Sequence, residues 1–187
     1  YGNPCVAVSC KFVAVGFAEV GNITILTSPS GTTWTSRTSG TTQELKGVTY
    51  GKGLFLAVGV SGTILTSSDG TTWTSRTSGT TLSLWGVTYG NGLFVTVGWG
   101  TILTSSDGTT WTKRTSGTSN NLFVVTYVNG LFVTVGYKGI ILTSSDGNSW
   151  TSRTSGTSNL LGGVTYGNST FVVVGNGGII LTSSNGT

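Results

Sequence analysis

One seven-residue segment, Ser-Ser-Asp-Gly-Thr-Thr-Trp, recurs in this chain about every 39 residues. It occupies residues 67–73 and 105–111, and a close variant occupies residues 144–150. Degraded copies lie at residues 28–34 and 183–187. A fixed period of 20–50 residues is typical of repeat architectures, in which each repeat is one supersecondary unit that stacks on its neighbours. The period therefore constrains the fold before any local pattern is considered.

The sequence pattern of each repeat predicts four short strands. In the second copy they cover residues 45–50, 54–58, 63–67 and 73–77, with glycine-bearing turns between them. Four antiparallel strands in about 40 residues are typical of one blade of a β-propeller. We therefore predict an all-β fold, a five-bladed β-propeller of four-stranded antiparallel blades in a single domain over residues 1–187. The predicted blades are approximately residues 5–40, 41–79, 80–117, 118–156 and 157–187.

The first and last copies are irregular. In the first, residues 5–8 are expected to form strand one and residues 12–16 strand two, with residues 17–24 inserted in the following turn. The fifth copy stops at Thr187, before its tryptophan and its outer strand. Blade five then has three strands, or is completed by further chain, or receives a strand from a partner, because an open strand edge can pair with another chain.

The repeated turn, Ser-x-Asp-Gly-x-x-Trp, resembles the Asp-box of the BNR/sialidase-type repeat. The pattern is closest to that of non-enzymatic bacterial propellers and of photosystem II assembly factors. The resemblance implies a propeller fold and does not specify a function. An aspartate in such a turn accepts backbone N–H groups two residues on, glycine takes the positive φ, and tryptophan packs on the blade. We assign this structural role to Asp69, Asp107 and Asp146 and to Trp34, Trp73, Trp111 and Trp150; Ser30 and Asn185 replace the aspartate in the end copies.

The composition argues against catalysis. The chain contains no histidine and only five acidic residues, so the commonest general base and metal ligand is missing. Three of the acidic residues are the turn aspartates, which leaves Glu19 and Glu44. The sialidase active site requires an arginine triad, whereas the arginines here recur once per repeat on the outermost strand. We predict no enzyme activity, no catalytic residues, no bound metal and no cofactor.

The cysteines and the glycosylation triplets favour a protein outside the cell. The net charge of +4 is spread without a basic cluster, which argues against nucleic-acid binding, and no apolar stretch is long enough to span a membrane as a helix. Cys5 and Cys10 are candidates for a disulfide, within the chain if the segment bends or between chains otherwise. Asn22, Asn168 and Asn185 begin glycosylation triplets. We expect a secreted or cell-surface location.

Two positions vary strongly among otherwise similar repeats. One follows the first-strand leucine and is occupied by Lys46, Trp85, Phe123 and Gly162; the other follows the second-strand Val-Gly and is occupied by Phe17, Val60, Trp99, Tyr137 and Asn176. Blade topology places both at one end, near the central channel, opposite the repeated aspartate turns. Trp85, Trp99, Phe123 and Tyr137, with Lys46, Asn120 and Asn121, are therefore candidate ligand-binding residues. The alternative is that these rings cap the channel and bury one another.

We hypothesise a non-enzymatic, lectin-like binding module whose partner is a glycan or another protein surface. Flat rings beside Asn, Thr and Ser suit sugar rings, and exposed aromatic surface in a charge-poor protein indicates interaction. The alternative is a structural, filament-forming extracellular protein that self-associates by strand completion or by a disulfide between subunits. A scaffold for assembly of a membrane complex is a third hypothesis, based on analogy with the family alone.

Overall fold

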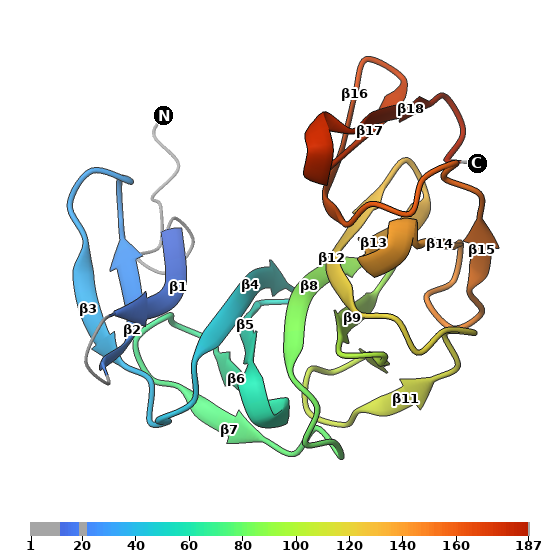
Figure 1. Ribbon diagram of the computed structural model, residues 1–187. Coiled ribbons are helices and arrows are strands. Elements are labelled where there is room, and N and C mark those ends of the chain that lie inside the picture. Colours follow the sequence, from blue (N-terminus) through green and yellow to red (C-terminus); the bar gives the residue numbers. More distant parts are fainter. Residues whose placement is uncertain (1–11, 19–21, 187) are drawn as a thin grey trace, which may run out of the picture.

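The computed structural model describes residues 12–18 and 22–186, and these form strands joined by tight turns (Figure 1). The strands make five separate antiparallel sheets, one for each sequence repeat. This arrangement confirms the predicted all-β, five-bladed propeller architecture. No helix among the described residues has the length and hydrophobicity that crossing a membrane requires.

The three middle blades each contain four strands that are neighbours in chain order. The second blade contains β4 (Leu45–Gly51), β5 (Leu54–Gly59), β6 (Ile64–Ser67) and β7 (Thr74–Arg76). The third contains β8 (Leu84–Gly90), β9 (Leu93–Gly98), β10 (Ile102–Ser105) and β11 (Thr112–Arg114). The fourth contains β12 (Leu122–Val128), β13 (Leu131–Gly136), β14 (Ile141–Ser144) and β15 (Thr151–Arg153).

Each end blade has three strands among the described residues. The first contains β1 (Phe12–Ala18), β2 (Asn22–Ser28) and β3 (Thr35–Thr38), and the fifth contains β16 (Leu161–Gly167), β17 (Thr170–Gly175) and β18 (Ile180–Ser183). Short 3-10 turns follow the second strand in three blades: η1 (Val60–Gly62), η2 (Tyr137–Gly139) and η3 (Asn176–Gly178). The strand predicted at residues 5–8 lies outside the described residues.

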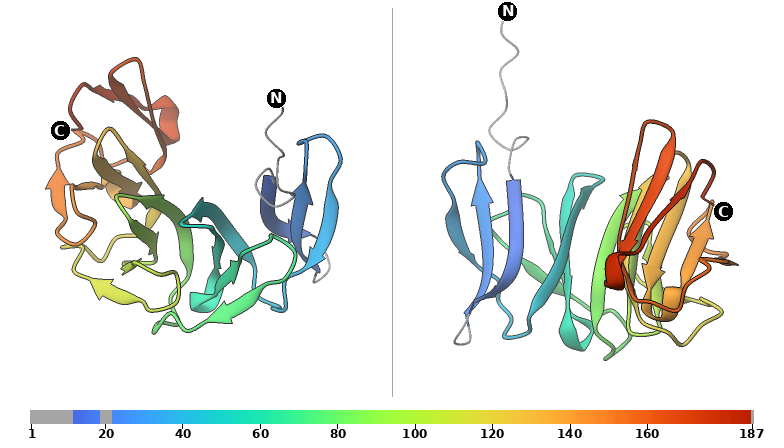
Figure 2. Two further views of the ribbon diagram at one scale, coloured as in Figure 1. Left: turned by 180° about the vertical axis from the view of Figure 1, so that it is seen from behind. Right: turned by 45° about the horizontal axis from the view of Figure 1, so that its top comes forward.

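The blades are arranged as an open arc (Figures 1 and 2). The first strands of neighbouring blades, β4, β8, β12 and β16, pack beside one another along its inside. The outer strands β7, β11 and β15 follow its rim, and the first and fifth blades stand apart at its two ends.

Neighbouring blades pack through alternating apolar side chains, because successive residues of a strand point to opposite faces of the sheet. The boundary between the third and fourth blades contains a buried cluster of Val95, Val97, Ile102, Leu122, Val125, Phe132 and Leu142. Trp150, from the aspartate turn of the fourth blade, packs against this cluster. Burying each large apolar side chain stabilises the fold by about 1.5–3 kcal/mol, so these boundaries hold the arc together.

The first blade differs from expectation in one respect. Residues 17–24, predicted as an insertion in a turn, mostly continue the two flanking strands. Phe17 pairs with Ile23 and Ala18 pairs with Asn22, so β1 and β2 form a longer hairpin. The prediction of a turn insertion was wrong because Phe17, Ile23 and Thr24 are strand formers that extend the ladder, and Ala18 and Asn22 continue its register.

A glycine at the end of the second strand lets the chain approach the loop that enters the same blade. Val60 N–H donates a hydrogen bond to Glu44 O at 2.9 Å, and Tyr137 N–H donates to Asn121 O at 2.8 Å. A Cβ atom on the preceding residue would lie 2.1 Å from Glu44 O at Gly59 and 2.0 Å from Asn121 O at Gly136. Only glycine fits this close approach.

We predict that Gly59→Ala lowers the free energy of unfolding by at least about 2 kcal/mol, because the methyl group displaces the Glu44 loop. Gly16→Ala is the matched control, since Gly16 holds the same repeat position and a Cβ there meets no atom of the described residues within 4 Å. The measurement is urea unfolding of both variants beside the parent. Equal losses in the two variants would contradict the steric explanation.

Candidate aromatic binding site

A β-bulge in the first strand of the second to fifth blades positions the first variable residue. In the third blade Leu84 pairs with Gly98 and Gly86 with Val97, so Trp85 is the extra, unpaired residue between them. Lys46, Phe123 and Gly162 occupy the corresponding bulges of β4, β12 and β16. A bulge redirects a side chain relative to the regular strand, so four variable residues leave the inner strands at equivalent points.

The second variable residue lies beside this bulge. Trp99 N–H donates to Ser83 O at 2.9 Å, directly before β8, and Tyr137 N–H makes the equivalent bond directly before β12. Both variable positions therefore lie at one end of the blades. The aspartate turns lie at the other end, because they join the third strand to the fourth.

Three aromatic rings form a stack at this end, which we call the aromatic stack. The ring centroids of Trp85 and Phe123 lie 5.0 Å apart at an interplanar angle of 28°, and those of Trp85 and Trp99 lie 6.5 Å apart at 22°. Trp85 and Phe123 are half-buried, whereas Trp99 remains 57% exposed. The stack thus joins two blades and presents its outermost ring to solvent.

The other candidate residues surround the stack without joining it. The Tyr137 ring is 47% exposed and lies 6.0 Å from Lys138 Nζ; within the described residues its ring contacts none of the three stacked rings. Lys46 pairs with Glu44 at 2.6 Å. Asn120 and Asn121 are half-buried in the loop that enters β12. The structure therefore supports a three-ring site with a polar border.

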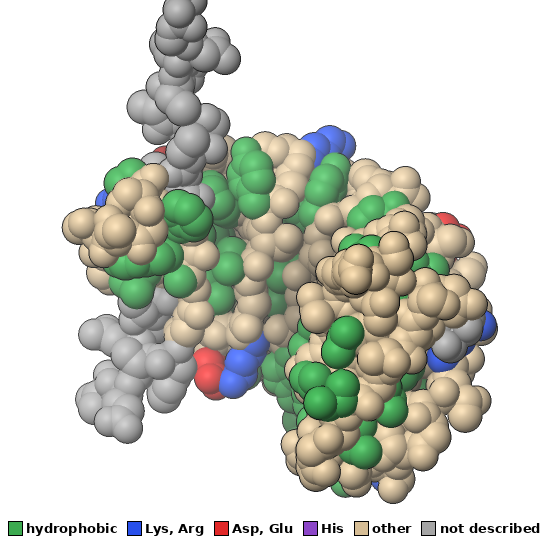
Figure 3. All heavy atoms as spheres, turned by 90° about the horizontal axis from the view of Figure 1, so that it is seen from above, with side chains coloured by type: hydrophobic (Ala, Val, Ile, Leu, Met, Phe, Trp, Pro, Cys, Tyr) green, Lys and Arg blue, Asp and Glu red, His purple; other side chains and the backbone are tan. Residues whose placement is uncertain are grey.

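The surface around the arc carries little charge. In the view from above, hydrophobic side chains alternate with uncharged polar groups, and charged side chains are few (Figure 3). The described residues contain no group of three or more His, Cys, Asp or Glu that could hold a metal ion.

The aspartate turns at the opposite end are closed by hydrogen bonds within the turn. Gly70 N–H donates to Ser67 Oγ at 2.8 Å, and Asp69 Oδ1 accepts from Thr71 N–H at 2.8 Å and from Thr72 N–H at 2.9 Å. Gly70 has a φ of 73°, which glycine adopts without strain. The carboxylates of Asp107 and Asp146 accept the equivalent pairs of backbone bonds.

The end copies keep part of this network. In the first blade Gly31 N–H donates to Ser28 Oγ at 2.8 Å, although Ser30 replaces the aspartate. In the fifth, Gly186 N–H donates to Ser183 Oγ at 2.9 Å beside Asn185. The indole N–H of Trp34, Trp73 and Trp150 donates to the turn glycine carbonyl, whereas the indole N–H of Trp111 is buried without a hydrogen-bond partner.

Hydrogen bonds to the ionised carboxylate lower the pKa of each turn aspartate. For Asp69 the largest cause is the Thr71 hydroxyl, for Asp107 the Thr110 N–H, and for Asp146 the Ser149 N–H. An aspartate whose pKa is lower in the folded protein than in the unfolded chain stabilises the folded state when its carboxyl group is ionised.

We predict that stability is constant above about pH 5 and falls as the pH drops below about 4, the ordinary aspartate pKa. The stabilisation is present above the unfolded pKa and is lost as the turn aspartates are protonated. The midpoints of urea unfolding between pH 7 and pH 2.5 measure this loss of stability. The triple variant Asp69→Asn, Asp107→Asn, Asp146→Asn retains an acceptor oxygen and should show a flatter pH profile; an unchanged profile would contradict the assignment.

The predicted glycosylation sites lie in the first and fifth blades. Asn168 is exposed in the turn between β16 and β17, with a φ of 48°, and Asn185 is exposed after β18. Asn22 begins β2. Cys5, Cys10 and Glu19 lie outside the described residues.

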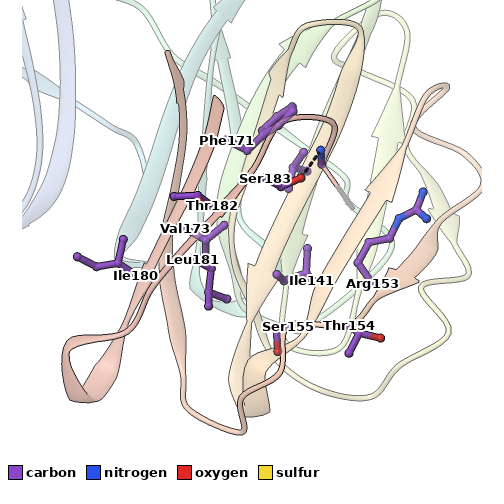
Figure 4. A pocket seen from close by; sticks show the side chains of 12 residues that line it. Ile141, Arg153, Thr154, Ser155, Phe171, Val173, Ile180, Leu181, Thr182 and Ser183 are labelled. Atoms are coloured by element: carbon purple, nitrogen blue, oxygen red, sulfur yellow. Dashed lines mark hydrogen bonds between the residues drawn. The ribbon is translucent and has the colours of Figure 1, made fainter. Parts of the chain in front are cut away.

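Sequence patterns did not point to a cavity between the fourth and fifth blades. It is lined by Ile141, Arg153, Phe171, Leu181 and other residues (Figure 4).

Comparison with solved structures identifies related folds. The structure superposes on YCF48 from Cyanidioschyzon merolae with a TM-score of 0.62 at 17% identity, covering 78% of this chain and 54% of that chain. A structure of YCF48 bound to D1 peptide gives 0.62 at 18% identity, covering 78% and 53%. The WD40 β-propeller domain of Doa1 gives 0.71 at 14% identity, covering 95% and 62%.

The chain therefore spans about half the length of the YCF48 chains. No protein-family model matches the sequence, and no curated protein matches it. Likeness at these identities shows a shared fold. On the evidence of its five sheets and its structural neighbours, the chain is a β-propeller.

Proposed function

We propose that this protein is a non-enzymatic, lectin-like module that binds carbohydrate on the aromatic stack. The observation that carries the proposal is the exposed Trp99 ring supported by Trp85 and Phe123. A ring fixed from behind loses little conformational freedom when a ligand stacks on its free face. The C–H face of a sugar ring matches this flat apolar surface.

The border of the stack supports the same ligand class. Asn120, Asn121 and Ser83 lie in the loops that enter the neighbouring blades, and amide and hydroxyl groups hydrogen-bond to neutral hydroxyl ligands. The one described ion pair nearby, Lys46 with Glu44, neutralises itself. The site therefore favours an uncharged polar ligand with one apolar face.

Peptide binding is the second candidate. It is supported by the fold shared with YCF48, a structure of which contains bound D1 peptide. An exposed Trp and Tyr also serve as anchors for protein partners. Carbohydrate is the leading candidate because the Trp99 ring is exposed and the surface around the arc carries few charged side chains.

Two further assignments accompany this proposal. The hydrogen-bond pattern around Asp69 supports membership of the Asp-box group of repeats. A secreted or cell-surface location agrees with a glycan ligand, and exposed Asn168 supplies a glycosylation acceptor that an intact-mass measurement after secretion would reveal.

We predict that Trp99→Ala weakens glycan binding at least tenfold, because it removes the exposed stacking surface. A glycan array with the parent protein selects the sugar, and calorimetric titration with that sugar gives the dissociation constants. Trp34→Ala is the matched control, since Trp34 is also exposed, at 41%, but lies at the opposite end of its blade.

The control variant should bind like the parent protein, and both variants should be folded at the temperature of the titration. Parent-like binding by Trp99→Ala would rule out the aromatic stack as the glycan site. Binding to a peptide array but to no glycan would favour the second candidate.

A further inference from the structure

The hairpin turns that join the first and second strands have the sequence Asn-Gly in the third and fourth blades. They are residues 91–92, between β8 and β9, and residues 129–130, between β12 and β13. The flanking residues pair directly with each other, so each loop has two residues. Both residues of a loop have a positive φ, which is 49° for Asn91 and 76° for Gly92. Such loops are typical of tight hairpins that follow the twist of their strands.

The side-chain amide and the backbone nitrogen that follows it are accessible in both turns. Asn91, Gly92, Asn129 and Gly130 are exposed, and a Cβ at either glycine would meet no atom of the described residues within 4 Å. Among the described residues, no hydrogen bond engages either asparagine side chain or the N–H of the glycine after it. These two groups are therefore available to react with each other.

Rotation of one peptide group brings the two groups together. Two-residue hairpin turns exist in two favoured types, one with a positive φ at both residues and one with a positive φ at the first residue only. Asn91 has the positive φ that both types require, and glycine adopts either sign of φ with little cost. Turning the peptide group between Asn91 and Gly92 therefore directs the Gly92 nitrogen toward the Asn91 Cγ while the two strands stay paired.

The same dipeptide occurs twice in the fifth blade, where hydrogen bonds restrain it. Gly186 N–H donates to Ser183 Oγ at 2.9 Å, and the Ser183 hydroxyl donates to Asn185 Oδ1 at 3.1 Å. In η3, Asn176 O accepts a hydrogen bond from Asn159 Nδ2 at 3.3 Å. That carbonyl belongs to the peptide group that would have to turn. The fifth blade thus provides two restrained copies of the sequence that is unrestrained in the third and fourth blades.

We propose that Asn91 and Asn129 are sites of spontaneous deamidation in the folded protein. The glycine nitrogen attacks the asparagine Cγ and forms a five-membered cyclic imide, while the N–H proton passes through solvent to the side-chain nitrogen, which leaves as ammonia. Water then adds to one of the two imide carbonyls and opens the ring, which leaves aspartate or isoaspartate. Water is the only co-reactant. The reaction is independent of the proposed glycan site, because these turns lie at the end of the blades opposite the aromatic stack.

Each event adds a negative charge beside the aspartate turn of the next blade. The turn that contains Asp146 packs on the residue after the third-blade hairpin turn, since a Cβ at Gly147 would lie 2.7 Å from the Leu93 side chain. In the second blade, Lys52 holds the position of Asn91, and its ammonium group donates at 3.0 Å to a carbonyl of the next aspartate turn. Deamidation of Asn91 therefore places like charges at this boundary between blades and destabilises it.

The test is incubation of the whole protein at pH 8, native and in urea, followed by peptide mapping that separates the aspartate and isoaspartate products by mass spectrometry. In urea the four Asn-Gly pairs should react at similar rates, because only the sequence then distinguishes them. In the native protein Asn91 and Asn129 should react at least about fivefold faster than Asn176 and Asn185, since a restraining hydrogen bond must break before the ring closes. Similar native rates at the four sites, or protection of all four, would overturn the proposal.

Variants test the cause and the consequence. Asn91→Lys reproduces the Lys-Gly turn of the second blade and should abolish modification in the third blade without changing the rate at Asn129. Asn91→Asp mimics one product and should have a lower urea midpoint than Asn91→Lys, and the difference should shrink at high salt because the charges are screened. A midpoint for Asn91→Asp equal to or above that of Asn91→Lys at low salt would contradict the proposed effect on the boundary.

Discussion

The structure depends on one requirement, that each blade cover the apolar face of the next. The same repeat positions have opposite exposures depending on whether this requirement is met. Val97 in the third blade and Val135 in the fourth are fully buried, whereas the equivalent Val174 in the fifth is 46% exposed. Ile102 is fully buried and its equivalent, Ile180, is 69% exposed. Since the side chains are alike, the difference arises because no further blade packs on the fifth among the described residues. Repeat proteins in general owe their stability to such nearest-neighbour interfaces.

The two ends of the strands have different roles in each blade. At one end, Asp69 and its equivalents satisfy backbone N–H groups within a turn, and the turn tryptophan continues into the boundary between blades. Those residues barely vary because each has a structural partner in every repeat. At the other end, the bulge and the glycine contact fix only the backbone, so the side chain that follows is free to change. Trp85, Phe123 and Trp99 occupy positions whose backbone is constrained and whose side chain is not, which is where a scaffold can acquire a binding surface.

Much of this architecture could be predicted from the sequence, because the same strand pattern occurs in several copies of the repeat. The strands, the fold and the clustering of variable positions at one end follow from period and topology. The stacking of Trp85 between Phe123 and Trp99 could not be derived, since it depends on the β-bulge that redirects Trp85. The longer β1–β2 hairpin was also missed, because comparison with the other copies made its extra residues look like an insertion. The curvature of the arc could not be predicted from the repeat period either, because packing between blades determines it.

The aromatic stack and the cavity beside β18 arise from opposite features of the repeat. The aromatic stack consists of residues that differ among blades, so its chemistry has to be inferred from the rings themselves. The cavity consists of residues that are the same in the preceding blades, where a tryptophan packs against them. Phe171 and Leu181 correspond to Phe132 and Leu142, which pack beside Trp150. An apolar surface that meets solvent costs free energy in proportion to its area, so the packing that joins neighbouring blades also decides which copies of one residue are buried.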